Sequence, residues 1–473
     1  MARGTGPGTH ARESQRLTEG ISLQTLRTTP RYAYLVAVVA AVGGLLFGYD
    51  IGVISGAEIF LKHAFHMSAS SEELAVSAVL IGGIIGGLIG GRLANAISRR
   101  RALMVMAVIY GVGAILTSIS PSYWFFFGFR VLVGVAVGAS SMIVPMYIAE
   151  LSPTKIRGGL TLLQQLFISG GILVSYLIDY GFAAAGWGWQ PMFAVAVIPA
   201  AILGTGMLFL DYSPRWLAMR GRWQEAERVM GRINPGTRDE EMEMLRKDME
   251  ERERTSGWEL LRPGLRGALI AGIGLGIFQQ FTGPNTVLYY TPTIFKDAGV
   301  AATSNALVST IYVGAVLFVF VFPAIGLVDW LGRRTLFYIG LSGMAAMLGA
   351  LGVVFHFGAA AFGPEVLAIL LIYVAFYSLS ISPLTWLMSA ELFPNRLRGA
   401  GGSATSVSVF AANFVIAETF LSELKLIGTP VTFWIYAFIA VLAIVFVRLV
   451  IPETKGRPLE NIEWYWTHGR RWR

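Results

Sequence analysis

Apolar residues follow one another along the chain in blocks of about 20, separated by short polar stretches. A helix of that length crosses a bilayer core of about 30 Å, so each block predicts one membrane-spanning helix. The glycine-rich stretch from Ile81 to Gly91 predicts close packing of the second helix against a neighbour. The pattern indicates an all-α membrane protein with twelve spans, which begin near Tyr34, Leu74, Ala102, Tyr123, Gly159, Met192, Gly267, Ser304, Thr335, Val366, Gly399 and Val431.

The composition of the chain agrees with a membrane protein. Of its 473 residues, 55% are hydrophobic and 14% are charged, whereas a soluble domain has roughly 25% charged residues. The formal net charge of +8 comes from cations spread over separate loops, so we expect no nucleic-acid partner. The chain has no cysteine, which excludes disulfides and thiolate metal sites.

Arginines and lysines mark the loops that follow the even-numbered helices. Cationic loops lie on the cytoplasmic side of a membrane, so these loops and both termini are expected to face the cytoplasm. The opposite loops hold few cations, such as Lys62 and Lys296. The cations that set this orientation are Arg99, Arg100, Arg101, Lys155, Arg157, Arg333, Arg334, Arg396 and Arg398.

A charged segment divides the predicted helices into two groups of six. This segment, residues 213–265, reads as a cytoplasmic linker with short helices between a half that covers residues 30–212 and a half that covers residues 266–451. Residues 1–29 are expected to be a disordered cytoplasmic tail and residues 452–473 a second cytoplasmic tail. The halves repeat their motifs, since YIAELSPTKIRGG in the first resembles MSAELFPNRLRGA in the second. The chain is therefore an internal duplication, as in transporters whose halves share a central cavity.

Several short motifs follow one another in a fixed order, namely FGYDIGVISG, GFRVLVGVAVG, AELSPTKIRG, QQFTGPNTVLYY, VDWLGRR, AELFPNRLRG and PETKG. In this order, from about residue 45 to residue 461, they resemble the sugar porter family of the major facilitator superfamily. The resemblance implies the major facilitator fold of twelve transmembrane helices in two six-helix halves. It also implies a small-molecule sugar and a proton as substrates, a place in the cell membrane bilayer, a monomer, and no cofactor or metal.

Three amide side chains interrupt the apolar seventh helix, at Gln279, Gln280 and Asn285. An amide without a partner in hydrocarbon costs several kcal/mol, so these side chains are expected to face the interior of the bundle. A break at Gly283 and Pro284 would bring them together, because proline removes a backbone hydrogen bond and bends the helix. Amides both donate and accept, so they complement sugar hydroxyls. The resemblance implies that they bind the substrate, and contact between helices is the alternative.

The resemblance assigns further residues to the cavity. Gln165 in the fifth helix is the expected hydroxyl-binding glutamine, and its neighbour Gln164 is the alternative if the register differs. Trp386 in the tenth helix is expected to lie against the C–H groups of the sugar. Tyr289 and Tyr290 match the extracellular gate of the family.

Four positions depart from the family pattern, at Ser309, Ser382, Val409 and Phe410. Many members have asparagine at the first position, glycine at the second, and a polar residue followed by tryptophan at the last two. One wall of the cavity is therefore expected to offer fewer amides. The substrate remains open among a hexose, a pentose, a deoxysugar and a polyol such as inositol.

Asp50 lies near the outer part of the first helix, in GLLFGYDIGVISG, and no charged residue precedes it for more than fifteen residues. Burial inside a membrane disfavours an ionised carboxylate, which makes this group a candidate proton carrier. Proton-coupled members of the family have aspartate here, and Arg130 in the fourth helix matches the arginine that pairs with it. The alternative is a static buried ion pair that fixes two helices.

A further set of charges matches the intracellular network that joins the two halves in this family. Such contacts hold one conformation and break in the other, and unrelated solvated charges are the alternative. The first-half counterpart of Asp329 is Asn95, and the motif after the sixth helix has Asp211 but no glutamate, so the N-terminal part is expected to be weaker. The members of this predicted latch are Glu150, Arg157, Asp329, Arg333, Arg334, Glu391, Arg398 and Glu453.

Together these features predict a secondary active transporter that imports a monosaccharide, a hexose or a pentose, with a proton by alternating access. An uncoupled facilitator of a sugar or an inositol-like polyol is the alternative, and a sugar sensor without transport is a third candidate. An enzyme is not expected, because none of the five histidines forms a ligand-spaced pair with a buried carboxylate.

Overall fold

The computed structural model describes residues 31–153, 156–252, 257–297, 303–358, 363–394, 397–455 and 460–469, and every structural statement below refers to these residues. The predicted tail 1–29, Lys155 and Arg396 lie outside them, as does the side chain of Lys296. The described chain is helical, without strands.

The helices before the linker are α3 (Arg31–Ala64), α4 (Ala69–Ile97), α5 (Arg99–Ser118), α6 (Tyr123–Glu150), α7 (Arg157–Ala184), α8 (Gln190–Ala194) and α9 (Val197–Leu208). The linker contains α10 (Pro214–Met219), α11 (Trp223–Ile233), α12 (Arg238–Arg252) and a 3-10 turn, η1 (Gly257–Leu261). The helices after it are α13 (Arg266–Phe281), α14 (Pro284–Asp297), α15 (Thr303–Leu331), α16 (Arg333–His356), α17 (Gly363–Leu379), α18 (Ile381–Glu391), α19 (Arg398–Leu426), α20 (Thr429–Val450) and α21 (Glu460–Thr467).

Eleven helical segments of the described chain are long and apolar enough to cross a membrane. Two of them join a pair of helices, α8 with α9 and α17 with α18. The predicted seventh span is divided between α13 and α14, each too short to qualify alone. With this broken pair as one more crossing, the bundle has the predicted number of spans.

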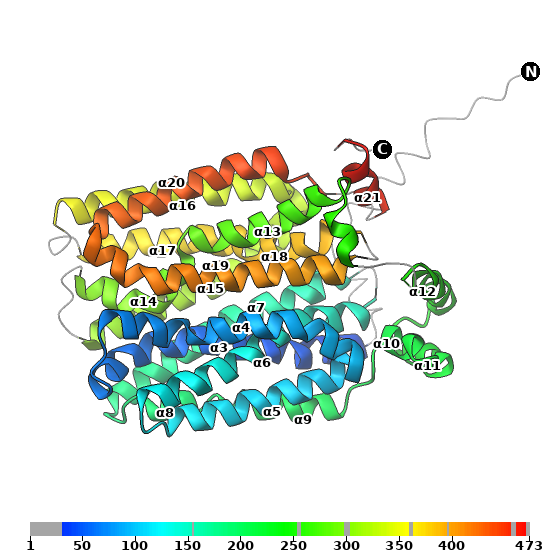
Figure 1. Cartoon of the computed structure of the whole chain (residues 1–473), viewed down its shortest axis with the longest axis horizontal. Coiled ribbons are helices and arrows are strands. Elements are labelled where there is room, and N and C mark those ends of the chain that lie inside the picture. The colour runs from blue at the N-terminus through cyan, green and yellow to red at the C-terminus, as the bar shows by residue number, and fades with distance from the viewer. Residues whose placement is uncertain are drawn as a thin grey trace, which may run out of the picture.

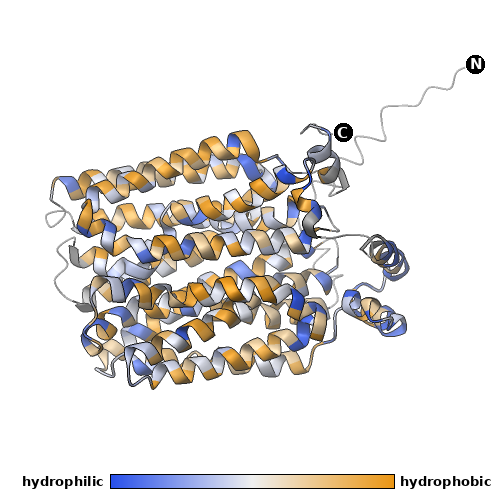
Figure 2. Ribbon diagram, viewed as in Figure 1, coloured by the Kyte–Doolittle hydropathy of each residue, from blue (hydrophilic) through white to orange (hydrophobic). Residues whose placement is uncertain are grey.

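Apolar residues cover the long helices, and hydrophilic residues gather at the ends of the bundle and on α11 and α12 (Figure 2). Large apolar side chains point outward along the helices: Leu88 is 60% exposed, Val108 64% and Phe438 62%. A soluble protein of this size does not expose so many large apolar side chains in one belt. The belt therefore identifies the surface that faces lipid.

The helices on either side of the linker form two groups (Figure 1). Helices α5, α6, α8 and α9 lie in the lower part of the view, whereas α13, α16, α17 and α20 lie in the upper part. The groups meet where α4 packs against α19 and α7 packs against α15. Helices α10, α11, α12 and α21 lie at one end of the bundle, on the right of Figure 1. We call this the linker end and the opposite end the far end.

Close packing of α4 against α6 follows from the glycine-rich stretch, as predicted. A Cβ atom on Gly86 would lie 2.2 Å from the carbonyl oxygen of Val135, and one on Gly138 would lie 2.1 Å from that of Gly83. Real Cβ atoms do not approach so closely, so only glycine allows these two backbones to touch. The contact makes α4 and α6 a rigid pair within the first half.

The first two linker helices, α10 and α11, are docked against the first half. The Ser213 hydroxyl caps α10 by accepting a hydrogen bond from the backbone N–H of Trp216, and the Trp216 indole donates to the Asn95 carbonyl at 3.0 Å. Arg232 of α11 pairs with Asp211 at 2.6 Å. Helices α10 and α11 are therefore attached to the first half, whereas η1 packs against α13 and α19 of the second half.

Candidate functional site

The broken seventh span places the predicted amides at the centre of the bundle. Helix α13 ends at Phe281 and α14 begins at Pro284, with Gly283 between them at φ +83°. This left-handed conformation favours glycine. A Cβ atom on Gly283 would also lie 2.6 Å from the ring of Tyr436. Both the backbone conformation and the close ring explain why the break falls at this residue.

The three amides form a chain of hydrogen bonds. Asn285 Nδ2 donates to Gln280 Oε1 at 2.7 Å, and Gln280 Nε2 donates to Gln279 Oε1 at 3.3 Å. Gln279 Nε2 donates in turn to the backbone carbonyl of Ser382 on α18 at 3.3 Å. All three amides are buried. The break thus gathers them as predicted, while sugar binding by these residues stays a prediction.

Ser382 also connects the two halves of the bundle. Gln165 Nε2 of α7 donates to the Ser382 hydroxyl at 3.0 Å, whereas its neighbour Gln164 donates to the Ser141 carbonyl within the first half at 3.1 Å. Gln165 is therefore the glutamine that faces the second half. The sequence marked Ser382 only as a departure from the family, because nothing local shows that two glutamines converge on it.

The two tyrosines of the predicted gate, Tyr289 and Tyr290, lie deep in the second half. The Tyr289 hydroxyl accepts a hydrogen bond from Asn413 Nδ2 at 3.0 Å, and the Tyr290 hydroxyl donates to the Ala417 carbonyl at 3.0 Å. Both side chains are fully buried. Asn413 is not among the residues predicted for the site, although it follows Val409 by one helical turn and is an amide in an apolar helix. Trp386 lies on α18, one turn after Ser382, and is partly exposed.

The departures from the family pattern produce an apolar wall where α19 meets the first half. Val409 and Phe410 are buried, and the Phe410 ring lies 5.7 Å from the ring of Phe47 on α3. A Cβ atom on Gly83 would lie 2.5 Å from Phe410, so the ring fills the contact between α4 and α19. Ser309 of α15 is buried as well.

Asp50 and Arg130 form a two-armed ion pair inside the first half. The two guanidinium nitrogens, Nη1 and Nη2, each donate to one carboxylate oxygen, the second at 3.2 Å. Neither side chain is more than 3% exposed. The Arg130 guanidinium also lies 5.4 Å from the ring centre of Phe193. The predicted partners are therefore in direct contact, away from water.

The first-half residues of the predicted latch gather at the linker end. Arg99 donates to Glu150 at 2.9 Å, and the Ser213 hydroxyl donates to the second oxygen of the same carboxylate. Arg99 is itself buried. From the sequence, Arg99 is expected only to orient the chain in the membrane, because its contact with Glu150 joins α5 to α6 and has no local signature. Arg157 lies at the start of α7.

The second half repeats this arrangement. Arg333 pairs with Glu391 at 3.0 Å and with Asp329 at 3.2 Å. Glu453 accepts hydrogen bonds from the backbone N–H groups of Arg333 and Arg334 at 3.1 and 2.9 Å. Arg398 lies at the start of α19. These pairs each stay within one half, so the contact between halves that the family latch implies remains a prediction.

Hydrogen bonds close the far end of the bundle between the two halves. They involve two buried acids of the first half, Glu58 and Glu73, together with the hydroxyls of Ser77 and Tyr176 from the same half, and groups on α14 and α19. No local pattern predicts these contacts, because the partners lie more than one hundred residues apart in the chain. The contacts are Thr293 to Glu58 at 2.8 Å, Ser77 to Glu418, Ser422 to both oxygens of Glu73 at 2.7 and 2.8 Å, and Tyr176 to the Leu288 carbonyl at 2.7 Å.

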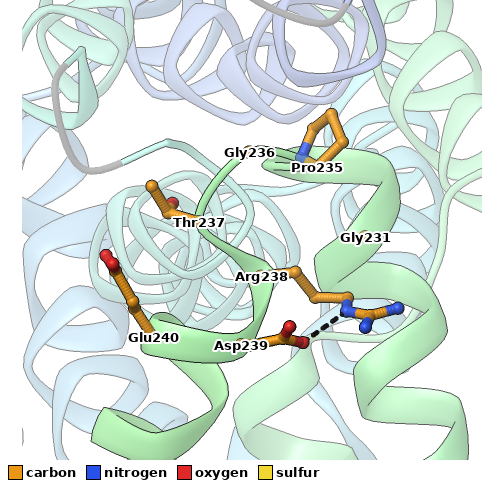
Figure 3. A pocket seen from close by; sticks show the side chains of 7 residues that line it. All are labelled: Gly231, Pro235, Gly236, Thr237, Arg238, Asp239 and Glu240. Atoms are coloured by element: carbon orange, nitrogen blue, oxygen red, sulfur yellow. Dashed lines mark hydrogen bonds and ion pairs between the residues drawn. The ribbon is translucent and has the colours of Figure 1, made fainter.

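A surface pocket of about 330 Å³ lies away from all these groups, in the linker. Figure 3 shows Arg238 beside Asp239 in it, and the two form an ion pair at 2.8 Å. The Asp239 side chain is 83% exposed. A shallow crevice with solvated charges offers little for recognition of a ligand. The buried amide chain is the better candidate site. The pocket is lined by Gly231, Pro235, Gly236, Thr237, Arg238, Asp239 and Glu240.

The family model for sugar (and other) transporters matches residues 36–466. The chain belongs to this sugar porter family. The galactose-proton symporter of Escherichia coli is 36% identical to this sugar porter over 453 residues, which are 94% of this chain and 97% of the relative. A D-xylose transporter of Levilactobacillus brevis is 38% identical over 428 residues, 89% of this chain and 93% of the relative.

The fold of this sugar porter matches that of a solved relative. The structure of the proton:xylose symporter XylE bound to 6-bromo-6-deoxy-D-glucose aligns with a TM-score of 0.83 at 34% identity, over 92% of this chain and 99% of that chain. The predicted family and major facilitator fold are thereby confirmed. The protein is a multi-pass membrane transporter of the sugar porter family and not an enzyme.

Proposed function

We propose that this sugar porter imports a monosaccharide together with a proton by alternating access. The observation that carries the proposal is the buried ion pair of Asp50 with Arg130. A carboxylate that binds a proton loses its attraction to the guanidinium, so protonation of Asp50 changes the contact between α3 and α6. The relatives named as galactose-proton and proton:xylose symporters support the assignment.

The amide chain supplies the proposed sugar site. Gln165, Gln279, Gln280 and Asn285 lie between the halves and bond one another or Ser382. A monosaccharide offers hydroxyls that both donate and accept, so it can exchange these contacts for its own without leaving a buried amide unpaired. Trp386 then lies against the apolar side of the ring.

The apolar wall limits which sugar fits best. Val409 and Phe410 offer no hydrogen bond to a hydroxyl that points at them, and leaving a buried hydroxyl unpaired costs about 1–3 kcal/mol. This favours a hexose or pentose that presents a C–H face or lacks a hydroxyl on that side. An inositol-like polyol, with a hydroxyl on every carbon, fits the wall less well.

The orientation follows from the distribution of cations. We propose that the linker end and both termini lie in the cytoplasm and that the far end faces outward across the cell membrane, with the protein acting as a monomer in the bilayer. Tyr289 and Tyr290 then gate the outer side, which the far-end contacts close. The charges at the linker end, including Glu150, Arg333 and Glu391, form the cytoplasmic latch.

One proton is enough to drive uphill transport. A charge that crosses 100 mV gains about 2.3 kcal/mol, so roughly 150 mV supplies about 3.5 kcal/mol. Each 1.4 kcal/mol corresponds to a tenfold ratio of concentrations, which gives accumulation of about several hundred fold.

Transport assays in proteoliposomes distinguish a symporter, a facilitator and a sensor. A hexose, a pentose, a deoxysugar and inositol are offered with and without an inward proton gradient, while uptake and external pH are recorded. Symport predicts accumulation above the external concentration and alkalinisation of the outer medium, both lost when the gradient is collapsed. Equilibration at the same rate with and without the gradient would instead show a facilitator. Binding without uptake would show a sensor.

A further inference from the structure

A second acid is buried in the first half, at Asp179 on α7. It is 1% exposed, and neither carboxyl oxygen has a hydrogen-bond partner of acceptable geometry. The carboxyl group lies against Gly56 of α3, where a Cβ atom would be 2.5 Å from Asp179 Oδ2. The nearby backbone N–H of Gly56 belongs to the interior of a helix and offers at most a weak contact. Asp179 therefore fits in the space left by the missing side chain of Gly56, but it lacks the hydrogen-bond donors that an ionised carboxylate needs.

The charges around Asp179 do not balance an ionised form. In the described chain Asp179 forms no ion pair, and the buried cation Arg130 of α6 is engaged by Asp50. The titratable groups that face it are Tyr49 on α3 and Tyr176 on α7, and Tyr49 donates its hydroxyl to the Met192 carbonyl.

The remaining neighbours bring no positive charge. Beyond Tyr176 lie Glu58 on α3 and Tyr289 on α14, and helix α8, with the sequence QPMFA, has no titratable side chain. An isolated ionised carboxylate is strongly disfavoured in such surroundings, and the protonated acid fits them.

The position of Asp179 connects it to the far-end closure. Gly56 follows Asp50 by six residues, or about 9 Å along α3 towards the far end. Tyr176, one turn before Asp179, donates its hydroxyl to Leu288 of the second half at 2.7 Å. Glu58, half a turn beyond Gly56, accepts from Thr293. Opening of the far end breaks both contacts. Water then reaches Tyr176 and Glu58, the side chains next to Asp179 on the side of the far end.

We propose that Asp179 is a second proton-binding site of this transporter, protonated while the far end is closed and in exchange with water when the far end opens. In that step the carboxylate takes a proton from the outer solution to become the neutral acid, and returns it there on reopening. The inference rests on the proposed proton coupling, to which it adds a proton-binding group that favours closure of the far end without carrying the proton across the membrane. Binding of a proton at Asp179 removes the charge that opposes closure, so external acid favours the closed far end.

Infrared difference spectroscopy tests this site without any transport. Purified wild-type protein in lipid is titrated from about pH 5 to 9, the range into which burial can bring a carboxyl group. We expect a C=O stretching band of a protonated carboxyl group that disappears at alkaline pH. Asp179→Asn should lose this band, Asp50→Asn should keep it, and Asp239→Asn, which removes an exposed acid of the linker, should leave the spectrum of the buried groups unchanged.

Transport provides the second measurement. Asparagine mimics the neutral acid, so Asp179→Asn should still exchange labelled sugar at equal concentrations, but with a smaller dependence on external pH than the wild type. Asp179→Ser, which is smaller, serves the same purpose if the asparagine variant does not fold. A band that is absent at every pH, or one that never titrates, overturns the proposal. If the Asp179 band titrates but the wild type never accumulates sugar, the second site stands and the coupled function fails.

Discussion

Ser382 shows how one side chain can organise a site between two halves of a protein. Its carbonyl accepts from Gln279 and its hydroxyl accepts from Gln165. The two glutamines come from different halves, so the serine holds α7 and α13 against α18. A glycine at this position keeps the backbone carbonyl but has no hydroxyl, so the Gln165 amide loses its hydrogen-bond acceptor.

Ser382→Gly should therefore raise the affinity for the transported sugar. Gln165 no longer bonds the serine hydroxyl and becomes available to the substrate, and one satisfied hydrogen bond is worth about 1 kcal/mol, or up to tenfold in Kd. Isothermal titration of the purified protein measures the change. Ser389→Ala, which removes a hydroxyl bonded to the Trp386 carbonyl of its own helix, is the control. Weaker binding in Ser382→Gly would show that the sugar itself uses the serine hydroxyl.

Gln280→Ala should weaken sugar binding while the protein stays folded. Gln280 accepts from Asn285 and donates to Gln279, so its loss disconnects the amide chain and leaves sugar hydroxyls unpaired at about 1–3 kcal/mol each. The same titration should show a Kd increased by about tenfold or more. Gln164→Ala is a matched control, because that amide bonds Ser141 within the first half. Equal affinity of Gln280→Ala and wild type would remove Gln280 from the site.

At the scale of helices, the break between α13 and α14 makes the site possible. An unbroken helix would turn Asn285 away from Gln280, whereas the structure joins them at 2.7 Å. Gly283 adopts a left-handed φ of +83°, and Tyr436 of α20 leaves no room for a side chain there. The glycine and the proline after it thus determine how the amides on the two sides of the break lie relative to one another.

Gly283→Ala should destabilise the protein and weaken sugar binding together. The left-handed conformation costs a residue with a side chain about 1–2 kcal/mol, and the overlap with Tyr436 adds to this. A thermal unfolding assay on detergent-solubilised protein should show a lower Tm. Gly349→Ala is the control, because a Cβ atom there, in a helical part of α16, meets no atom within 4 Å. A Tm equal to that of the wild type would mean that α14 can shift away from Tyr436.

The sequence predicted the features that depend on local patterns. Apolar blocks of about 20 residues gave the helices, the Gly-Pro pair gave the break, and Gly86 and its neighbours gave the close packing of α4. It did not predict the contacts of Ser382, Asn413 or Glu73, because each depends on a partner brought near by the arrangement of the two halves. The unpartnered Asp179 was missed for the same reason: an aspartate near a helix end reads as solvated until α3 is seen to cover it.

For the whole molecule, the contacts of Glu73 with Ser422 help to decide which side is open. Both carboxyl oxygens of this buried acid accept from Ser422, one from its backbone and one from its hydroxyl. They form only while α4 and α19 are together at the far end. Their strength therefore adds to the stability of the conformation with this end closed.

Ser422→Ala should shift the population towards the conformation with an open far end. The variant loses one charge-assisted hydrogen bond, worth about 1.5–3 kcal/mol, and so favours opening by about tenfold or more. Since the chain has no cysteine, Thr291→Cys on the buried face of α14 introduces a single reporter. In the Ser422→Ala background this cysteine should react faster with a maleimide added outside than it does in the otherwise wild-type protein. Ser118→Ala, which loses a bond within α5, should label at the wild-type rate. Unchanged labelling in Ser422→Ala would exclude this contact as a determinant of closure.

The alternation of the two halves is driven, on the present proposal, by the charge of Asp50. Asp50→Asn keeps the shape of the protonated acid, so the protein should fold and exchange labelled sugar at equal concentrations, a process without net proton movement. It should fail to accumulate sugar against a gradient and should lose most of its dependence on external pH between about 5 and 8. Exchange and uphill uptake are measured in the same proteoliposomes, with Asp239→Asn as the control. Accumulation at the wild-type level in Asp50→Asn would show that a group other than Asp50 carries the coupled proton.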